Sequence, residues 1–140
     1  MSFHYLLMAV QATVHKKLLA GLGGTGLTPG QPKVLDYLGE EDGANQTAIA
    51  RACYIEPASL TAVLGGMEAK GLITRRTLNG NRRSLHVFLT PLGRQMQQRT
   101  AQSFQMLEDR AFRGFSPRER EEFEGLFTRI YTNLTEEGQE

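Results

Sequence analysis

Arginine side chains are concentrated in one stretch of this chain, where their charge could bind phosphate groups. Residues 51–94 carry seven basic and two acidic side chains, a net charge of +5, although the whole 140-residue chain has a formal net charge of only +1. Two pairs, Arg75–Arg76 and Arg82–Arg83, supply four of the seven positive charges. Any exposed hairpin can carry arginines, but charge gathered in one unit also fits a surface that attracts the phosphates of a nucleic acid.

Small and hydroxyl-bearing residues accompany these arginines on a predicted helix at 57–69. Apolar residues recur there at the three- and four-residue spacing of a buried stripe, at Leu60, Val63, Leu64 and Met67. The positions left to face outward are Ala58, Ser59, Thr61, Ala62 and Gly65. Serine and threonine hydroxyls can bind either bases or phosphates, so we expect this face to contact DNA. The alternative is that Ser59 only caps or hydrates the start of the helix.

A shorter helix is predicted just before, with Asn45 as its N-cap and with Ile49 and Ala52 on its inner side. Gln46 and Thr47 would then lie in its first turn. Backbone N–H groups and polar side chains at a helix start can hold a phosphate. Plain capping of the helix accounts for the same two residues equally well.

Two short strands follow the helix at 57–69. Residues 73–77 and 85–89 have strand composition, and Asn79-Gly80 is a typical turn sequence between them. Three helical patterns that end in a basic hairpin are the layout of a winged helix-turn-helix, here at 28–90. The expected fold class is therefore mainly α with a small β-hairpin (α+β).

The four hairpin arginines have different expected roles. Arg82 and Arg83 follow the tip of the wing at 77–84, where an arginine can enter a narrow minor groove of DNA. Arg75 and Arg76 are neighbours on the first strand, and strand alternation sends them to opposite faces. We therefore expect only one of this second pair to face phosphate.

The first helix of the winged unit is predicted from its start signal. Thr28-Pro29-Gly30-Gln31 has the pattern of a capping box with proline at the first helical position. Val34, Leu35 and Leu38 then form its apolar face. The glycine-rich segment before it is expected to end the preceding helix.

Long amphipathic helices are predicted on both sides of the winged unit, at 1–22 and 91–136 within one domain of 1–140. Within 91–136, the start signals of the two helices are Thr90-Pro91 and Ser116-Pro117-Arg118-Glu119. Their apolar stripes exceed the need of one small core, so we expect them to form an intersubunit bundle; packing within a monomer is the alternative. The candidate dimerisation residues are Phe3, Leu7, Val10, Phe123, Phe127, Ile130 and Tyr131.

Other function classes find little support in the sequence. The segment GLGGTG at 21–26 matches G-x-G-x-x-G, but a helix precedes it and no parallel-sheet pattern exists, so we expect no dinucleotide and no other cofactor. The three histidines and one cysteine are scattered, which makes a zinc site unlikely on spacing grounds. No catalytic arrangement is visible, so we expect no enzyme.

The expected location is the cytoplasm. No apolar run approaches the length of about 20 residues that crosses a membrane, and the first segment has its basic pair after its apolar part, unlike a secretory signal. The single cysteine, Cys53, agrees with a reducing compartment. At the end of a short helix beside Ile49, it is expected to be a buried core residue rather than a peroxide sensor.

Several fragments together resemble the MarR family of bacterial transcription regulators. They are LTPGQ-x-x-VL at 27–35, MEAKGLI at 67–73, RR at 75–76, NRRS at 81–84 and LTPLG at 89–93. Their order and spacing agree over nearly the whole chain. The resemblance implies a homodimer held by the N- and C-terminal helices, a recognition helix at 57–69 in the major groove, and a wing in the minor groove. It also implies a pseudo-palindromic double-stranded DNA site and, in many members, release by a small aromatic or phenolic effector.

Three departures from the family pattern leave a second hypothesis open. Asn81 stands where many members have aspartate, Ala62 where arginine is common, and Gly65 and Gly66 where charged residues are common. The leading hypothesis is a ligand-responsive, sequence-specific repressor. The alternative is a winged-helix protein-interaction module that has lost specific DNA binding. The residues that would bind an effector are not identifiable from the sequence.

Overall fold

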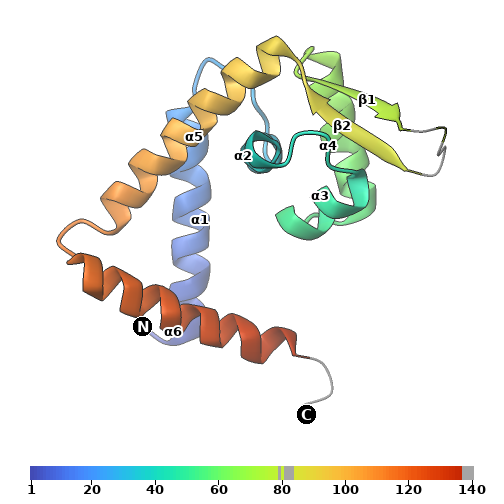
Figure 1. Ribbon diagram of the computed structural model, residues 1–140. Coiled ribbons are helices and arrows are strands. Elements are labelled where there is room, and N and C mark those ends of the chain that lie inside the picture. The colour runs from blue at the N-terminus through green and yellow to red at the C-terminus, as the bar shows by residue number, and fades with distance from the viewer. Residues whose placement is uncertain (79, 81–83, 137–140) are drawn as a thin grey trace. The chain divides into compact units, whose positions relative to one another are not determined.

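A computed structural model gives the arrangement of the chain over residues 1–78, 80 and 84–136 (Figure 1). In these residues the elements are α1 (Phe3–Gly21), α2 (Gln31–Glu40), α3 (Gln46–Cys53), α4 (Pro57–Ala69), β1 (Ile73–Thr77), β2 (Leu85–Leu89), α5 (Pro91–Ala111) and α6 (Pro117–Thr135). The fold is mainly α with one β-hairpin, as predicted.

The chain forms two compact units that divide within α5. Residues Met1–Leu107 make the first unit and Glu108–Glu140 the second. The winged helix-turn-helix lies wholly in the first. No helix in the described part of the chain is long and apolar enough to cross a membrane.

The core of the winged unit lies between α2, α3, α4 and the hairpin. It consists of fully buried aliphatic side chains, among them Val34, Leu35, Leu38, Ile49, Leu60, Leu64, Met67, Ile73 and Val87. Val63, expected on the same stripe, is half-buried at its edge. Ala52 was expected inside but is exposed, because the inner face of α3 runs through Ile49, Ala50 and Cys53. Position 52 lies at the flank of that face, nearly opposite Ala50 around the helix.

The start of α2 differs from the predicted capping box. The helix begins at Gln31, and its N-cap is Gly30, with φ +91° and no side-chain cap. Half of the expected box remains, since the Gln31 Oε1 atom accepts a hydrogen bond from the Thr28 N–H at 3.1 Å. The left-handed backbone at Gly30 excludes Pro29 from the helix, whereas Pro32 lies in its first turn.

The hairpin has the predicted bounds. Its antiparallel register pairs Ile73 with Leu89 and Thr77 with Leu85. The turn after α2 adds to it through a bridge between Asn45 and His86. The start of α3 is thereby fixed beside β2.

The passage from β2 into α5 is tightly bonded. The Thr90 hydroxyl donates to the Gly71 carbonyl at 2.6 Å and accepts from the Gly93 N–H at 2.9 Å, as the predicted N-cap should. A Cβ atom at Gly93 would lie 1.9 Å from the Leu72 carbonyl oxygen, so only glycine fits there. The first turn of α5 therefore rests directly on the backbone that enters β1.

Asp42, just after α2, also connects β2 to α5. Its carboxylate accepts from the Leu89 N–H at 2.8 Å and pairs with Arg94 at 3.2 Å. Three elements, α2, β2 and α5, thus share one acidic side chain.

In the second unit, α6 starts with the predicted capping box. Ser116 Oγ accepts from the Glu119 N–H at 3.1 Å, and the Glu119 carboxylate accepts from the Ser116 N–H at 2.8 Å. Phe123 and Phe127 stack along the helix with ring centroids 5.3 Å apart. Both rings are more than two-fifths exposed within this unit.

Candidate nucleic-acid interface

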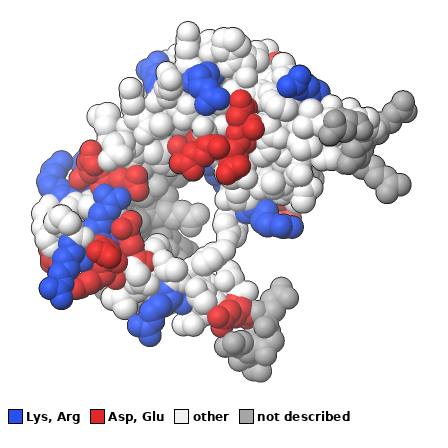
Figure 2. Space-filling model, in the orientation of Figure 1, with Lys and Arg blue, Asp and Glu red and all other residues white. Residues whose placement is uncertain are grey.

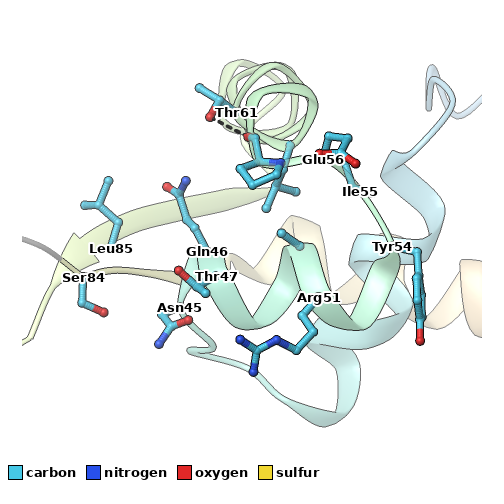
Figure 3. A pocket seen from close by; sticks show the side chains of 13 residues that line it. Asn45, Gln46, Thr47, Arg51, Tyr54, Ile55, Glu56, Thr61, Ser84 and Leu85 are labelled. Atoms are coloured by element: carbon cyan, nitrogen blue, oxygen red, sulfur yellow. Dashed lines mark hydrogen bonds between the residues drawn. The ribbon is translucent and has the colours of Figure 1, made fainter. Parts of the chain in front are cut away.

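A groove of about 710 Å³ opens between the starts of α3 and α4 and the beginning of β2 (Figure 3). Its walls are mostly amide, hydroxyl and small apolar side chains. The residues around it are Asn45, Gln46, Thr47, Ala50, Arg51, Tyr54, Ile55, Glu56, Pro57, Leu60, Thr61, Ser84 and Leu85. Residues at the starts of two helices therefore border one hollow surface.

The start of α3 is organised as the sequence predicts. Asn45 Oδ1 accepts from the Ala48 N–H at 2.8 Å, which confirms the N-cap. Thr47 is exposed at the groove. Gln46 is half-buried, and Figure 3 shows its side chain directed toward α4. Asn45 therefore caps α3. The hydroxyl group of Thr47 remains accessible to a ligand.

The outward face of α4 carries the small residues expected there. Ser59, Thr61 and Ala62 are exposed, and Gly65 is partly exposed. The Thr61 hydroxyl donates to the Pro57 carbonyl of its own helix at 3.1 Å, so it offers an outside partner its lone pairs and its methyl group. This face can approach another surface closely because no long side chain stands on it.

The two adjacent glycines of α4 have different surroundings. A Cβ atom at Gly65 would meet nothing within 4 Å, whereas one at Gly66 would lie 2.9 Å from Gln31 Nε2. A side chain at 66 would therefore have to move the Gln31 amide, whereas one at 65 would meet nothing in the protein. The sequence alone could not separate these two positions.

Arg75 and Arg76 lie on opposite faces of β1, as alternation predicts. Arg75 pairs with Glu68 at 3.2 Å and donates to Gln46 Oε1 at 3.4 Å. The guanidinium of Arg76 lies 4.0 Å from the centre of the Phe88 ring. Hydrogen bonding to Arg75 holds the pKa of the Glu68 carboxyl below its ordinary value.

Arg82 and Arg83, the predicted wing contacts, lie outside the described residues, as does Asn79 of the predicted turn. Ser84 and Leu85 follow them directly and border the groove.

Sequence reasoning missed several exposed residues at the groove, among them Arg51, Tyr54 and the acidic Glu56. Arg51 is one helical turn beyond Thr47, which places both on one side of α3. Figure 3 shows Arg51 and Tyr54 directed away from α4. The i, i+4 spacing from Thr47 to Arg51 was the signal that could have identified the first of them. Tyr54 has a left-handed backbone, with φ +54°, at the turn between the two helices.

Charge on the rest of the surface is mixed. On the face of the molecule in Figure 2, basic and acidic side chains of the described residues are interspersed rather than gathered into one basic area. On this face the described residues form no broad basic area.

Cys53 is a core residue, as predicted. It is 8% exposed, and its thiol donates to the Lys33 carbonyl at 3.6 Å. Burial raises the pKa of the thiol, with a smaller opposing effect from Lys33. A protonated, covered thiol is a poor nucleophile.

No three histidine, cysteine, aspartate or glutamate side chains come together as a metal site within the described residues. The glycine-rich segment 21–26 connects two helices, α1 and α2, rather than a strand and a helix. It therefore lacks the setting of a dinucleotide loop.

A second cavity, of about 490 Å³, lies between α1, the start of α2 and Phe104 of α5. Its walls are Met8, Gln11, Ala12, Val14, His15, Leu18, Leu19, Gly30, Pro32, Lys33 and Phe104. Lys33 and His15 are the basic groups in an otherwise largely apolar lining.

The helices, hairpin and groove together define a winged helix-turn-helix protein. Residues 27–85 match the model of the MarR family, and the chain belongs to that family. It is 34% identical over 112 residues to a Thauera aromatica protein named as the presumed transcriptional regulatory protein for the hcr operon, covering 79% of this chain and 67% of that one. Members of this family are transcription regulators and not enzymes.

Two further relatives agree over most of their length. An HTH-type transcriptional repressor of Mycobacterium bovis is 25% identical, with 90% of this chain and 91% of the relative covered. The transcriptional repressor CouR, solved bound to a 23-mer DNA duplex, is 29% identical with a TM-score of 0.81, covering 93% and 92% of the two chains.

Proposed function

We propose that this protein is a transcriptional repressor that binds a pseudo-palindromic DNA site as a homodimer, with α4 as its recognition helix. The observation that carries the proposal is the groove formed by two helix starts beside the hairpin. Its amide and hydroxyl side chains and Arg51 suit a DNA backbone, and the small outward face of α4 suits close approach to base edges. The DNA-bound structure of CouR, a relative of matching fold, supports it.

Homodimer formation is supported by apolar side chains that the chain itself leaves uncovered. On α1, Phe3 and Val10 are 53% and 51% exposed, and Leu7 is 38% exposed. On α6, Phe123, Phe127 and Tyr131 are each 44–50% exposed, and Ile130 is partly buried. Burial of such stripes in a partner copy would be favourable by about 25 cal/mol per Å² of apolar surface. A two-fold dimer would then present two recognition helices to successive major grooves, roughly 34–36 Å apart.

The second cavity is the proposed effector site. Its apolar walls suit an aromatic ring, and Lys33 and His15 suit an anionic group. The preference for an aromatic anion rests in part on the family resemblance. Action on chromosomal DNA would place the protein in the cytoplasm.

The competing hypothesis is a protein-interaction module without specific DNA binding. Ala62 and Gly65 favour it, because neither has a side chain that can read a base by hydrogen bonds. The exposed hydroxyls of Ser59 and Thr61, and the open groove beside them, favour DNA.

A mobility-shift assay with the DNA upstream of the protein's own gene separates the two. We expect a saturable shift that survives excess unrelated DNA at about 150 mM salt, because specific sites exceed non-specific binding by about 10³ or more. Equal affinity for the upstream fragment and for a shuffled copy of it would overturn specific binding. A thermal-shift screen of salicylate-like compounds, followed by DNA competition, tests the effector separately.

A further inference from the structure

Gln31 is one of only two polar side chains that are buried in the described part of the chain. It is 2% exposed. Its Oε1 atom accepts from the Thr28 N–H at 3.1 Å and from Lys70 Nζ at 2.8 Å. The first bond lies within the loop that enters α2, and the second reaches the end of α4. Gln31 therefore ties that loop to the recognition helix.

The contact on α4 runs along one row of the helix. Val63, Gly66 and Lys70 follow one another at spacings of three and four residues, on the side roughly opposite Thr61 and Gly65. The Gln31 amide occupies the space that a side chain at Gly66 would need, since a Cβ atom there would lie 2.9 Å from Nε2. Lys70 also donates to the Gly26 carbonyl of the loop.

The same turn of chain also forms part of the second cavity. Gly30, Pro32 and Lys33, which flank Gln31 on both sides, line that cavity. A Cβ atom at Gly30 would lie 3.1 Å from Val63 Cγ2, so the backbone itself touches α4. A molecule that displaces residues 30–33 must therefore displace Gln31 against α4.

We propose that Gln31 is a positioning residue that transmits occupancy of the second cavity to the recognition helix through Lys70 and Gly66. The effect on DNA rests on the proposed function. The coupling between the second cavity and α4 does not. An occupant that moves the start of α2 changes the contacts on the rear of α4. The outward face that carries Thr61 and Gly65 then shifts relative to DNA. Coupling of this kind requires only that the occupant prefer one of the two arrangements.

The test fills the cavity by substitution, so that it needs no identified effector. Ala12→Phe adds a phenyl group at a residue of the cavity wall. Thr13→Phe adds the same group at the next position of α1, which does not line the cavity. Amide hydrogen exchange of residues 57–69 is measured for each full-length variant, with and without Gln31→Leu.

We expect Ala12→Phe to change the exchange rates of α4 about fivefold or more, at the lower end of ordinary coupling between sites, and Thr13→Phe to leave them unchanged. In the Gln31→Leu background, the effect of Ala12→Phe should disappear. Gly66→Ala should abolish it as well, whereas the matched Gly65→Ala should not. An effect of Ala12→Phe that is absent, or that is equal with and without Gln31, overturns the proposal.

DNA affinity of the same variants separates this inference from the proposed function. If exchange follows the expected pattern and the protein binds no DNA, the coupling stands and the repressor function fails. If the protein binds DNA and Ala12→Phe weakens that binding equally in both backgrounds, the function stands and the role of Gln31 fails. Melting temperatures of all variants identify any that do not fold.

Discussion

The Arg75 guanidinium on β1 pairs with the Glu68 carboxylate on α4, with Nη2 and Oε1 3.2 Å apart. The same guanidinium donates to Gln46 on α3. One side chain thus joins the hairpin to both helices of the helix-turn-helix. The sequence placed Arg75 among the candidate DNA contacts, and the structure gives its charge partners inside the protein.

We expect Arg75→Ala to weaken DNA binding, because it removes the links from the hairpin to α4 and to α3, and Glu68→Gln to weaken it less, because it removes the ion pair and keeps the bond to Gln46. The measurement is DNA affinity at several salt concentrations. If Arg75 instead served mainly as a phosphate contact, Glu68→Gln would strengthen binding, since it removes a negative charge and frees the guanidinium. That opposite sign distinguishes positioning from direct contact.

The wing arginines are expected to bind phosphate directly. Replacing Arg82 and Arg83 by alanine should weaken binding to all sequences and flatten the plot of log affinity against log salt by about 0.9 per lost contact. Unchanged affinity and slope in the double variant would remove the wing from the interface.

Arg51 is expected to contact the DNA backbone beside the start of α3. Arg51→Ala should lower affinity and reduce the salt slope by about 0.9, the value for one phosphate contact. Arg129→Ala, on α6, is the matched control and should leave both quantities unchanged. A loss confined to one DNA sequence would instead indicate a base contact.

The exposed stripes of α1 and α6 should make the protein a tight two-fold dimer. Sedimentation at micromolar concentration should give about twice the 15.6 kDa chain mass. Phe127→Asp should shift the equilibrium toward monomer, because a charge would have to enter the apolar contact. A wild-type monomer at that concentration would contradict the proposal.

The Cys53 thiol should be unreactive in the folded protein. Burial raises its pKa, so the folded state holds the thiol proton at a pH where the unfolded state releases it. Stability linked to this group is therefore fully present below the pKa of the unfolded thiol and falls as pH rises above it. Alkylation by iodoacetamide at pH 8 should be much slower than in denaturant. A change of DNA affinity after mild peroxide treatment, absent in Cys53→Ala, would reinstate a redox role.

Local signals in the sequence predicted the elements that local chemistry determines. Asn45, Thr90 and Ser116 each cap the helix that the sequence assigned to them. Both strands have the predicted bounds, because alternation and the Asn-Gly turn signal are properties of neighbouring residues. These elements were enough to define the fold class.

Contacts between residues far apart in the chain account for the features that the sequence did not predict. Nothing near Arg75 in the chain indicates that it forms an ion pair with Glu68 and a hydrogen bond with Gln46. The close contact at Gly66 comes from Gln31, 35 residues earlier in the chain, whereas a Cβ atom at Gly65 would meet nothing within 4 Å. The pattern at 28–31 suggested a full capping box, but Gly30 adopts a left-handed backbone where it touches Val63.

The contact between Gly93 and the Leu72 carbonyl has a mechanical consequence. There is no room for a methyl group at Gly93, and hydrogen bonds of Thr90 and Asp42 surround the contact. The start of α5 is therefore held firmly on the winged unit. The winged unit and residues 91–107 are then expected to move as one rigid body, in which this part of α5 is about 25 Å long at 1.5 Å per residue. A tilt of about 5° over that length moves the far end by about 2 Å. Gly93→Ala, which puts a methyl group against the Leu72 carbonyl, should therefore loosen the junction between α5 and the winged unit.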